Sequence, residues 1–476
     1  MQTFDLVVIG SGPGGYIAAI RASQLGLKVA IIERAELGGV CLNWGCIPTK
    51  ALLKAAELKR AIAHAADFGL KVKDEGLDFA KIISRSRDVA AQLSKGIGFL
   101  MKKNKIEVLK GEARFQGPNT LEILTTNNQQ PTTVAFAHAI IATGARAKQI
   151  KGVLEADGKH IWTAREAMVP AELPASLLII GGGAIGVEFA SFYAALGCKV
   201  TLAEAQTRIV PAEDEEISAQ LHKALEKEGM QVLTNAKVAN LTATKTGVSA
   251  EINGQPATFS RAILAIGVVG NTEGLNLPAP QMGHSGKATG GVVVEKGAID
   301  VNEFYQTATP HIYAIGDVAG APWLAHVASH EGVIAAEHIA HTAGKGPKPH
   351  PMDYANIPGC TYCTPQVAST GFTEAAAIAA GHKVKVGRFN YQANGKALAM
   401  GEPTGMVKVV FDESTGALLG AHIIGAEATE MITTFVLGRS MEAVEEDFLH
   451  ACLPHPTLSE MIGEAVLNAE GRTLNA

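Results

Sequence analysis

Two cysteines, Cys41 and Cys46, lie in the segment Gly-Gly-Val-Cys-Leu-Asn-Trp-Gly-Cys-Ile-Pro-Thr-Lys at residues 38–50. Two thiols at this spacing near the start of a helix can form a disulfide if the chain between them is distorted, and Gly45 and Pro48 would supply that distortion. The helix dipole and neighbouring cations stabilise a thiolate at such a place, which favours thiol–disulfide exchange. The pair is therefore predicted to be redox-active.

From the residues alone, the pair could instead bind zinc or be structural. A zinc site needs four ligands, and no further Cys or His lies close enough in sequence to complete one with Cys41 and Cys46. The pair could also be two small buried residues, although the surrounding Gly, Asn and Pro are poor core material. Six cysteines in 476 residues do not form the disulfide framework of a secreted protein.

The other four cysteines are less informative. Cys360 and Cys363 form a C-x-x-C pair, for which we predict a strand that contributes small side chains to a core, with a redox or metal-binding role as the alternative. Cys198 and Cys452 are predicted to be structural. No metal site is predicted.

The elements that would position the redox pair begin at the N-terminus. An apolar run typical of a buried parallel strand leads into Gly-Ser-Gly-Pro-Gly-Gly at residues 10–15, and a helical pattern and a second apolar strand ending at Glu33 follow. In such a βαβ unit Gly10 permits the tight turn, Gly12 lets the backbone approach a pyrophosphate, and Gly15 lets helix and strand pack closely. The helix start would bind phosphates, and Glu33 would accept hydrogen bonds from ribose hydroxyls.

A second unit repeats the first. An apolar strand leads into Gly-Gly-Gly-Ala-Ile-Gly at residues 181–186, and Glu204 follows at the same separation as Glu33 in the first unit. Two such units predict two bound dinucleotides. A carboxylate at Glu204 would accept a bond from a free 2′-hydroxyl and repel a 2′-phosphate, which favours NAD over NADP, although the nearby Arg208 weakens this inference.

Composition limits the class of protein. The chain has 476 residues, 47% hydrophobic and 18% charged, with 51 glycines, which is typical of a soluble α/β enzyme of about three domains. A net charge of -5 argues against nucleic acid as the partner. We see no basic leader or cleavage site before the first strand, so we expect a cytoplasmic protein, with an organellar enzyme that has lost its transit peptide as the alternative.

The segment 38–50 resembles the redox-active disulfide motif of the class I flavoprotein disulfide reductases, which are pyridine nucleotide-disulfide oxidoreductases. Three further segments resemble motifs of this family in the same order along the chain. Residues 142–144 are similar to the end of the FAD domain, residues 309–317 to the second FAD motif, and residues 453–460 to the C-terminal His-Glu motif. The match is closest to the branch that oxidises protein-bound dihydrolipoyl groups to lipoyl groups with NAD.

The resemblance implies a role for each catalytic residue. Cys41 would exchange with the substrate, and Cys46 would face the flavin and pass electrons to it. His455 would take the substrate thiol proton and Glu460 would orient His455, because thiol–disulfide exchange requires a thiolate and therefore a base. A further implied pair, Lys50 and Glu188, would lie near the flavin and the nicotinamide.

The resemblance also implies two sets of residues that bind cofactors. The set for FAD is Gly10, Gly12, Gly15, Glu33, Lys50, Ala113, Thr143, Gly144, Asp317 and Ala325. The set for NAD is Gly183, Gly186, Glu188, Glu204, Val238 and Gly267.

The implied organisation is an α/β fold with two Rossmann-like domains and a C-terminal α+β interface domain. We expect a split FAD domain at 1–148 and 274–346, an NAD domain at 149–273, and an interface domain at 347–476. In the family the last domain forms a homodimer, so that His455 of one subunit would reach the disulfide of the other. The implied partners are the lipoyl domains of 2-oxoacid dehydrogenase acyltransferase subunits or the lipoyl protein of the glycine cleavage system.

Related activities make different demands. A glutathione reductase would use NADPH and carry Arg near Glu204, mercuric and thioredoxin reductases of this shape carry a C-terminal Cys pair, and soluble transhydrogenases lack the first redox cysteine. A different class is a subunit whose main role is docking to a larger complex. Leu453 and Pro454 depart from the family pattern beside His455, which could alter the geometry of the base but not its main role.

Overall fold

The computed structural model describes residues 1–125, 130–282 and 288–475. The chain divides into two compact units, each assembled from three segments. The first unit comprises residues 1–51, 83–148 and 267–352, and the second comprises residues 52–82, 149–266 and 353–476.

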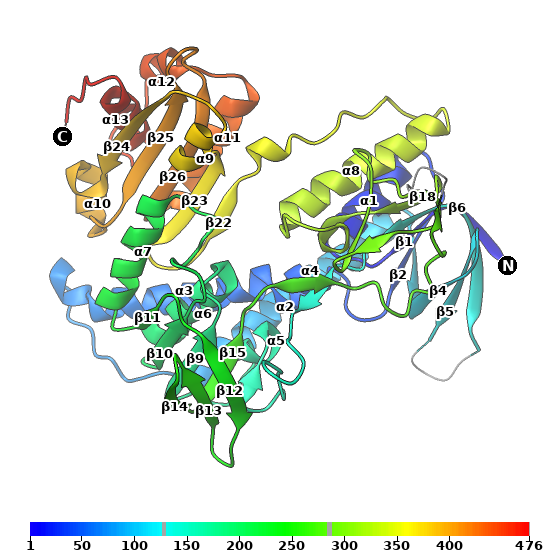
Figure 1. Cartoon of the computed structure of the whole chain (residues 1–476), viewed down its shortest axis with the longest axis horizontal. Helices are drawn as coiled ribbons and strands as arrows, with labels where there is room; N and C mark the ends of the chain where they lie inside the picture. The colour runs from blue at the N-terminus through cyan, green and yellow to red at the C-terminus, as the bar shows by residue number, and fades with distance from the viewer. Residues whose placement is uncertain (126–129, 283–287, 476) are drawn as a thin grey trace. The chain divides into compact units, whose positions relative to one another are not determined.

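The first unit is built on a seven-stranded sheet in the order β3-β2-β1-β6-β5-β4, with β21 paired to β6 (Figure 1). β1, β2, β3, β6 and β21 pair in parallel, whereas β4 and β5 form an antiparallel extension. Their buried faces are almost continuously apolar, as a sheet covered on both sides requires. The bounds are β1 Gln2–Ile9, β2 Val29–Glu33, β3 Glu107–Lys110, β4 Glu112–Gly117, β5 Thr120–Leu124, β6 Thr132–Ile141 and β21 Ile312–Ala314.

Helices and short strands complete the first unit. α1 (Pro13–Gln24) follows β1 and packs along α8 (Ala325–Thr342), as Figure 1 shows. The helices cross closely because Gly14 and Gly332 face each other, and a Cβ built on Gly332 would lie 2.5 Å from the Gly14 carbonyl oxygen. The remaining elements are α2 Gly39–Trp44, η2 Gly316–Ala319, β7 Ala145–Ala147, β16 Val268–Gly270, β17 Gln281–Met282, β18 Ala288–Gly290, β19 Val294–Glu295 and β20 Ala298–Ile299.

The second unit contains a parallel sheet in the order β11-β10-β9-β15-β8. α6 (Ala184–Ala195) connects β9 to β10 and is buried along most of its length, so that this βαβ arrangement repeats that of β1, α1 and β2. A three-stranded antiparallel sheet lies between β11 and β15 in the chain. The bounds are β8 Ile161–Trp162, α5 Ala164–Ala167, β9 Ser176–Ile180, β10 Lys199–Ala203, α7 Glu215–Lys227, β11 Gln231–Leu233, β12 Val238–Ala243, β13 Val248–Ile252, β14 Gln255–Phe259 and β15 Arg261–Leu264.

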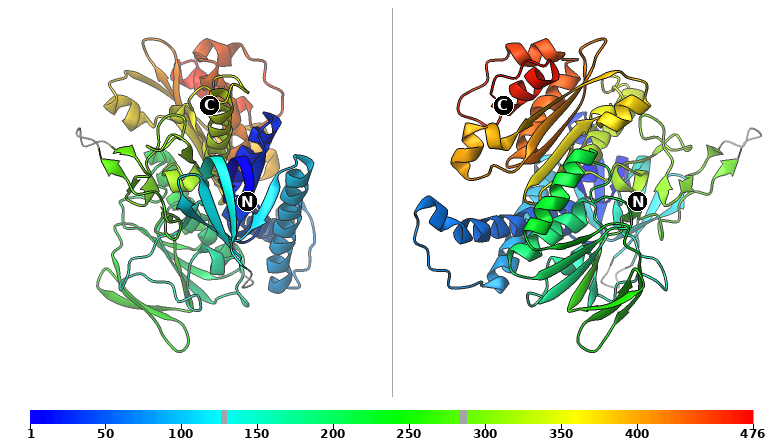
Figure 2. Two further views of the ribbon diagram at one scale, coloured as in Figure 1. Left: turned by 90° about the vertical axis from the view of Figure 1, so that its right-hand side faces the viewer. Right: turned by 60° about the vertical axis from the view of Figure 1, so that its left-hand side comes forward.

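The C-terminal part of the second unit is a five-stranded antiparallel sheet, β22-β23-β26-β25-β24. Alternate residues of β25 and β26, among them Val407 and Ile423, form one core with Phe435 of α11 and Met461 of α13, so these helices cover the same face (Figure 2). The bounds are η3 Tyr354–Asn356, β22 Gly359–Thr361, β23 Gln366–Gly371, α9 Glu374–Ala379, β24 Val384–Asn390, η4 Tyr391–Ala393, α10 Gly395–Met400, β25 Met406–Asp412, β26 Leu418–Gly425, α11 Ala428–Ser440, α12 Glu445–His450 and α13 Glu460–Ala469.

After α2, three further helical segments precede β3. They are α3 Cys46–Ala63, η1 Ala65–Phe68 and α4 Phe79–Lys103. In the part of the chain that the structure describes, no helix combines the length and the apolar character needed to cross a membrane. The predicted class, two Rossmann-like units with a C-terminal α+β domain, is confirmed, and the boundaries predicted for the three domains stay predictions.

The crossing of α1 and α8 generates a stability prediction. Gly332→Ala should lower the free energy of unfolding by about 1–3 kcal/mol, because the added methyl group collides with the backbone of α1. The midpoint of urea unfolding measures the change. Gly96→Ala, in the open middle of α4, is the matched control and should raise stability by about 0.5–1 kcal/mol. Equal effects of the two variants would contradict the close crossing.

Candidate functional site

The two cysteines of the motif lie on consecutive helices. Cys41 is in α2, Gly45 separates the helices, and Cys46 is the first residue of α3, as the predicted distortion requires. Their side chains are hydrogen-bonded to each other. The structure therefore brings the two sulfurs together at a helix start.

The pair controls the protonation of Cys41. The hydrogen bond with Cys46 raises the pKa of the Cys41 thiol, burial raises it further, and the charge of Lys50 lowers it by less. A thiol with a raised pKa keeps its proton and is a poor nucleophile. Exchange at this site therefore needs a base that removes a proton.

A serine that the sequence analysis did not single out holds the redox segment to the first glycine-rich loop. Ser11 is only 1% exposed, and its carbonyl oxygen accepts the Gly38 N–H at 3.1 Å. Gly39 lies so close that a Cβ there would be 2.6 Å from the Cα of Gly12. The motif gave no signal for Ser11, because the position between its first two glycines accepts many residues.

A second group of residues that sequence reasoning missed braces α2. The side-chain amide of Asn43 donates to the carbonyl oxygens of Leu37 and Gly39 at 3.0 Å each. Arg87 on α4 donates to the Asn43 carbonyl oxygen at 2.6 Å and stacks on the Trp44 ring at 4.1 Å. The Asn within the motif was visible in the sequence, whereas Arg87 carried no sequence signal.

The first glycine-rich loop has the geometry of a dinucleotide site. Gly10 has a φ of 101° and packs against the Ala142 carbonyl group, where a Cβ would collide. A Cβ on Gly15 would collide with the Gly10 carbonyl oxygen. Gly12, the N-cap of α1, meets no described atom within 4 Å of its Cβ position. A pyrophosphate would fit this helix start.

The second loop repeats this geometry. Gly181 has a φ of 109° and packs against the Ala265 carbonyl group, and a Cβ on Gly186 would collide with the Gly181 carbonyl oxygen. Gly183 is the N-cap of α6 and also meets no described atom within 4 Å of its Cβ position. The two loops thus have the same backbone conformation at their first glycine and the same open position at the glycine that begins the helix.

The acidic residue of each unit is fixed by main-chain N–H groups. Glu33 accepts from Ser11 N at 3.0 Å and from Ala35 N at 2.8 Å. Glu204 accepts from Gly182 N at 2.6 Å and from Gln206 N at 2.8 Å. Each carboxylate is therefore held at the edge of its loop, with oxygen lone pairs left for a ribose hydroxyl.

Arg208 does not convert the second unit into a phosphate site. Its guanidinium donates to a carboxylate oxygen of Glu215 at 2.8 Å and to the Pro211 carbonyl oxygen at 3.1 Å. These two bonds direct the arginine charge toward the start of α7.

The other residues predicted to hold FAD lie at strand ends and helix starts of the first unit. Ala113 is buried in β4, and Ala325 is the first residue of α8. Thr143 and Asn271 bond reciprocally, since the Thr143 hydroxyl donates to the Asn271 carbonyl oxygen at 2.7 Å and the Asn271 amide donates to the Thr143 carbonyl oxygen at 3.0 Å. Gly144 accepts the Asn271 N–H, and burial raises the pKa of Asp317 in η2.

The other residues predicted to hold NAD lie in the second unit, except Gly267, which belongs to the first. Glu188 on α6 is buried and accepts the Tyr362 N–H at 2.9 Å. Val238 begins β12. Lys50 and Glu188 belong to different units, so their proposed pairing stays a prediction.

His455 and Glu460 form a pair at the start of α13. His455 Nδ1 lies 2.8 Å from Glu460 Oε1, and the Thr457 N–H donates to Glu460 Oε2 at 2.8 Å. The Thr457 N–H and then His455 lower the pKa of Glu460, so it stays a carboxylate at neutral pH. The His455 side chain is 80% exposed. The unusual Leu453 packs against the C-terminal core and leaves this pair intact.

The remaining cysteines have ordinary surroundings, with one correction. Cys360 on β22 packs against the C-terminal core, as predicted. Cys363 is buried, but it lies in the loop between β22 and β23 and not on a strand, and its thiol donates to the Pro365 carbonyl oxygen at 3.0 Å. Cys198 is buried. Cys452 is exposed, and its predicted structural role stays a prediction. Its position before the His455 segment, outside the packed helices, explains the exposure.

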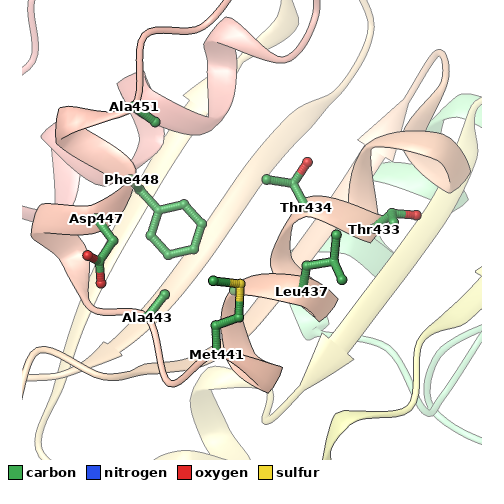
Figure 3. Close-up of a pocket in the computed structure, with 9 residues that line it drawn as sticks. Thr433, Thr434, Leu437, Met441, Ala443, Asp447, Phe448 and Ala451 are labelled. Carbon is green, nitrogen blue, oxygen red and sulfur yellow. The ribbon is translucent and has the colours of Figure 1, made fainter.

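A pocket of the second unit is lined by none of these groups. It has a volume of about 450 Å³ and opens between α11 and α12, where Leu437, Met441 and Phe448 form an apolar wall with Asp447 at its edge (Figure 3). No residue predicted to bind a cofactor or to act in catalysis lines it.

Comparison with protein families gives two matches. Residues 4–332 match the family described as "Pyridine nucleotide-disulphide oxidoreductase". Residues 357–466 match its dimerisation domain.

Curated relatives match over the full length. A "Dihydrolipoyl dehydrogenase" of Rhizobium etli is 48% identical over 494 residues, covering 100% of both chains. Proteins of the same name from Zymomonas mobilis and Bacillus subtilis are 49% and 44% identical, each covering 99% of both chains.

Solved structures share the fold. The flavoprotein disulfide reductase RclA of Escherichia coli, in a Cu(II) complex, superposes with a TM-score of 0.85 at 25% identity, covering 98% of this chain and 99% of that one. LpdA of Mycobacterium tuberculosis superposes with a TM-score of 0.86 at 24% identity, with the same coverage.

Proposed function

Since the chain belongs to the pyridine nucleotide-disulphide oxidoreductase family, we propose that it oxidises protein-bound dihydrolipoyl groups to lipoyl groups and reduces NAD. The observation that carries this proposal is the hydrogen-bonded pair of Cys41 and Cys46, joined through Ser11 to a dinucleotide loop. Full-length relatives named dihydrolipoyl dehydrogenase support the choice of substrate.

Membership of this family implies FAD and NAD(H) as cofactors. The two loops fit two dinucleotides, because each offers an open glycine at a helix start and a fixed carboxylate behind it. We assign FAD to the loop of Gly12 with Glu33, and NAD to the loop of Gly183 with Glu204. When bound, the flavin accepts the two electrons of the dithiol and delivers them to NAD as a hydride.

The chemistry of the chain's own residues is thiol–disulfide exchange. A dihydrolipoyl thiolate attacks the sulfur of Cys41 in the oxidised pair, so that a mixed disulfide forms and Cys46 leaves as a thiolate. The second substrate sulfur then displaces Cys41 and closes the lipoyl disulfide. The substrate loses two electrons to the cysteine pair, one proton stays on Cys41, and the other goes to a base.

We assign that base to His455. Glu460 stays charged and holds His455 Nδ1, which fixes the tautomer and leaves Nε2 for proton exchange. The match of residues 357–466 to a dimerisation domain supports a homodimer. In that dimer His455 of one subunit would serve Cys41 of the other.

The finer assignments follow from the proposed activity. The lipoyl groups would be carried by acyltransferase subunits of 2-oxoacid dehydrogenase complexes or by the lipoyl protein of the glycine cleavage system. The proposed location is the cytoplasm.

The Arg208–Glu215 ion pair supports NAD over NADP, because it engages the arginine charge nearest in sequence to Glu204 and directs it away from a 2′-phosphate.

Paired steady-state assays of the purified flavoprotein test the proposal. NAD reduction by dihydrolipoamide should be fast, and NADPH oxidation by glutathione disulfide should be slower by several orders of magnitude. Cys41→Ser should abolish the first activity, because no mixed disulfide can form. Fast turnover only with NADPH and glutathione disulfide would assign the chain to another branch of the family.

Heterodimers test whether the base acts between subunits. Co-expression of Cys41→Ser and His455→Gln chains with different affinity tags yields dimers that carry both changes. If His455 of one subunit serves Cys41 of the other, one of the two sites keeps both groups, and about half of the wild-type turnover should return. Each homodimeric variant should be slower than wild type by several orders of magnitude, and a heterodimer equally slow would place both groups in one subunit.

A further inference from the structure

Arg60 is an extensively bonded side chain of the second unit that the proposed chemistry does not use. It lies in the last turn of α3, the helix that begins with Cys46, and its side chain is 15% exposed. Its guanidinium donates to the Ser191 carbonyl oxygen at 3.0 Å, to the Ser191 hydroxyl at 3.1 Å, and to the Thr364 hydroxyl at 3.1 Å. A longer contact of 3.3 Å joins it to Glu228.

Two of these partners belong to a contact between helix α6 and the loop that joins β22 to β23. In that loop the Thr364 N–H donates to the Ser191 hydroxyl at 3.1 Å. Two residues earlier, the Tyr362 N–H donates to Glu188 Oε1 at 2.9 Å. Ser191 and Glu188 are one helical turn apart and both are buried. The backbone of this loop therefore fixes the Glu188 carboxylate.

The guanidinium suits this place for a physical reason. Its donors point in fixed directions within one plane, so one side chain can bond a helix and a loop at once. Loss of these donors would remove the bonds by which α3 holds Ser191 and Thr364, and would free the loop to shift relative to α6. A shift of the loop moves the Tyr362 N–H away from Glu188.

We propose that Arg60 is a positioning residue for Glu188: it holds the loop between β22 and β23 on α6, and the Tyr362 N–H of that loop holds the carboxylate at the nicotinamide site. This inference rests on the proposed function, because it takes Glu188 as part of that site. Arg60 should therefore affect electron transfer between the flavin and NAD(H), and it should not affect thiol–disulfide exchange with the substrate.

Rapid mixing of the full-length holoenzyme separates the two half-reactions. In Arg60→Leu, reduction of the bound flavin by NADH should be slowed about tenfold to a hundredfold, because misplacement by about 1 Å costs that much. The KM for NAD should rise as well. Reduction by dihydrolipoamide should stay within about twofold of wild type, and Arg60→Lys should recover part of the NADH rate, because the ammonium still donates.

Arg261→Leu is the matched control. Arg261 is a partly buried arginine of the same unit, bonded to Ser260 and Glu172 and to neither α6 nor the loop. In this variant the rates of flavin reduction by NADH and by dihydrolipoamide should both remain near those of the wild-type protein. Equal slowing of both half-reactions in Arg60→Leu would show a merely structural role and overturn the proposal, as would an unchanged NADH step.

Two further measurements keep the result decisive. If Arg60→Leu does not fold, Thr364→Val is the second variant, because it removes only one hydrogen-bond acceptor and keeps nearly the same shape. It should slow the reduction of the flavin by NADH about twofold to fivefold, and an unchanged rate would overturn the proposal.

NADH oxidation with ferricyanide as acceptor needs no lipoyl substrate. A chain that fails with dihydrolipoamide but shows the Arg60 effect with ferricyanide would refute the proposed substrate and retain the role of Arg60.

Discussion

A buried carboxylate bonded to the main chain of a glycine-rich loop is the interaction on which the rest of this molecule depends. Glu33 fixes Ser11, and Ser11 in turn accepts the N–H of Gly38 at the start of the redox segment. One connected set of hydrogen bonds therefore holds the glycine-rich loop at the helix start and the segment that carries the cysteine pair. Glu204 fixes the second loop in the same way, so both proposed dinucleotide sites rest on the same geometry.

The second unit depends on charges that are themselves buried. Lys408 on β25 is 2% exposed and bonds Asp214 at 2.9 Å and Glu216 at 2.7 Å, next to the start of α7. A charge so deeply buried is tolerated only when it is paired, so this cluster specifies how α7 meets the C-terminal sheet. Burial raises the pKa of the neighbouring Glu213 to about 7.

Local patterns in the sequence were sufficient to predict much of the fold. Each βαβ unit lies within one short stretch of sequence, from the strand through the glycine-rich loop to the acidic residue. The spacing within it follows from the physical role of each residue in binding a dinucleotide. The pairing of His455 with Glu460 was also predictable, because the two residues are near neighbours on one turn and the start of one helix.

Other parts of the site had no local signal. Arg87 braces Asn43 across 44 positions, and Arg60 bonds Thr364 across 304 positions, so only the folded chain brings these groups together. Ser11 was missed for another reason, since its position in the loop accepts many residues and its hydroxyl matters only because Glu33 is buried behind it. The exposure of Cys452 likewise depends on packing that its neighbours in sequence do not specify.

We propose that the cysteine pair and the flavin form one redox unit. Anaerobic titration of the holoenzyme with dithionite, followed by flavin absorbance, tests it most directly. We expect uptake of about four electrons per flavin, two by the disulfide of Cys41 and Cys46 and two by the flavin, and about two in Cys46→Ser. Uptake of two electrons per flavin in the wild-type protein, with both cysteines titratable as thiols beforehand, would show that the pair and the flavin do not form one redox unit.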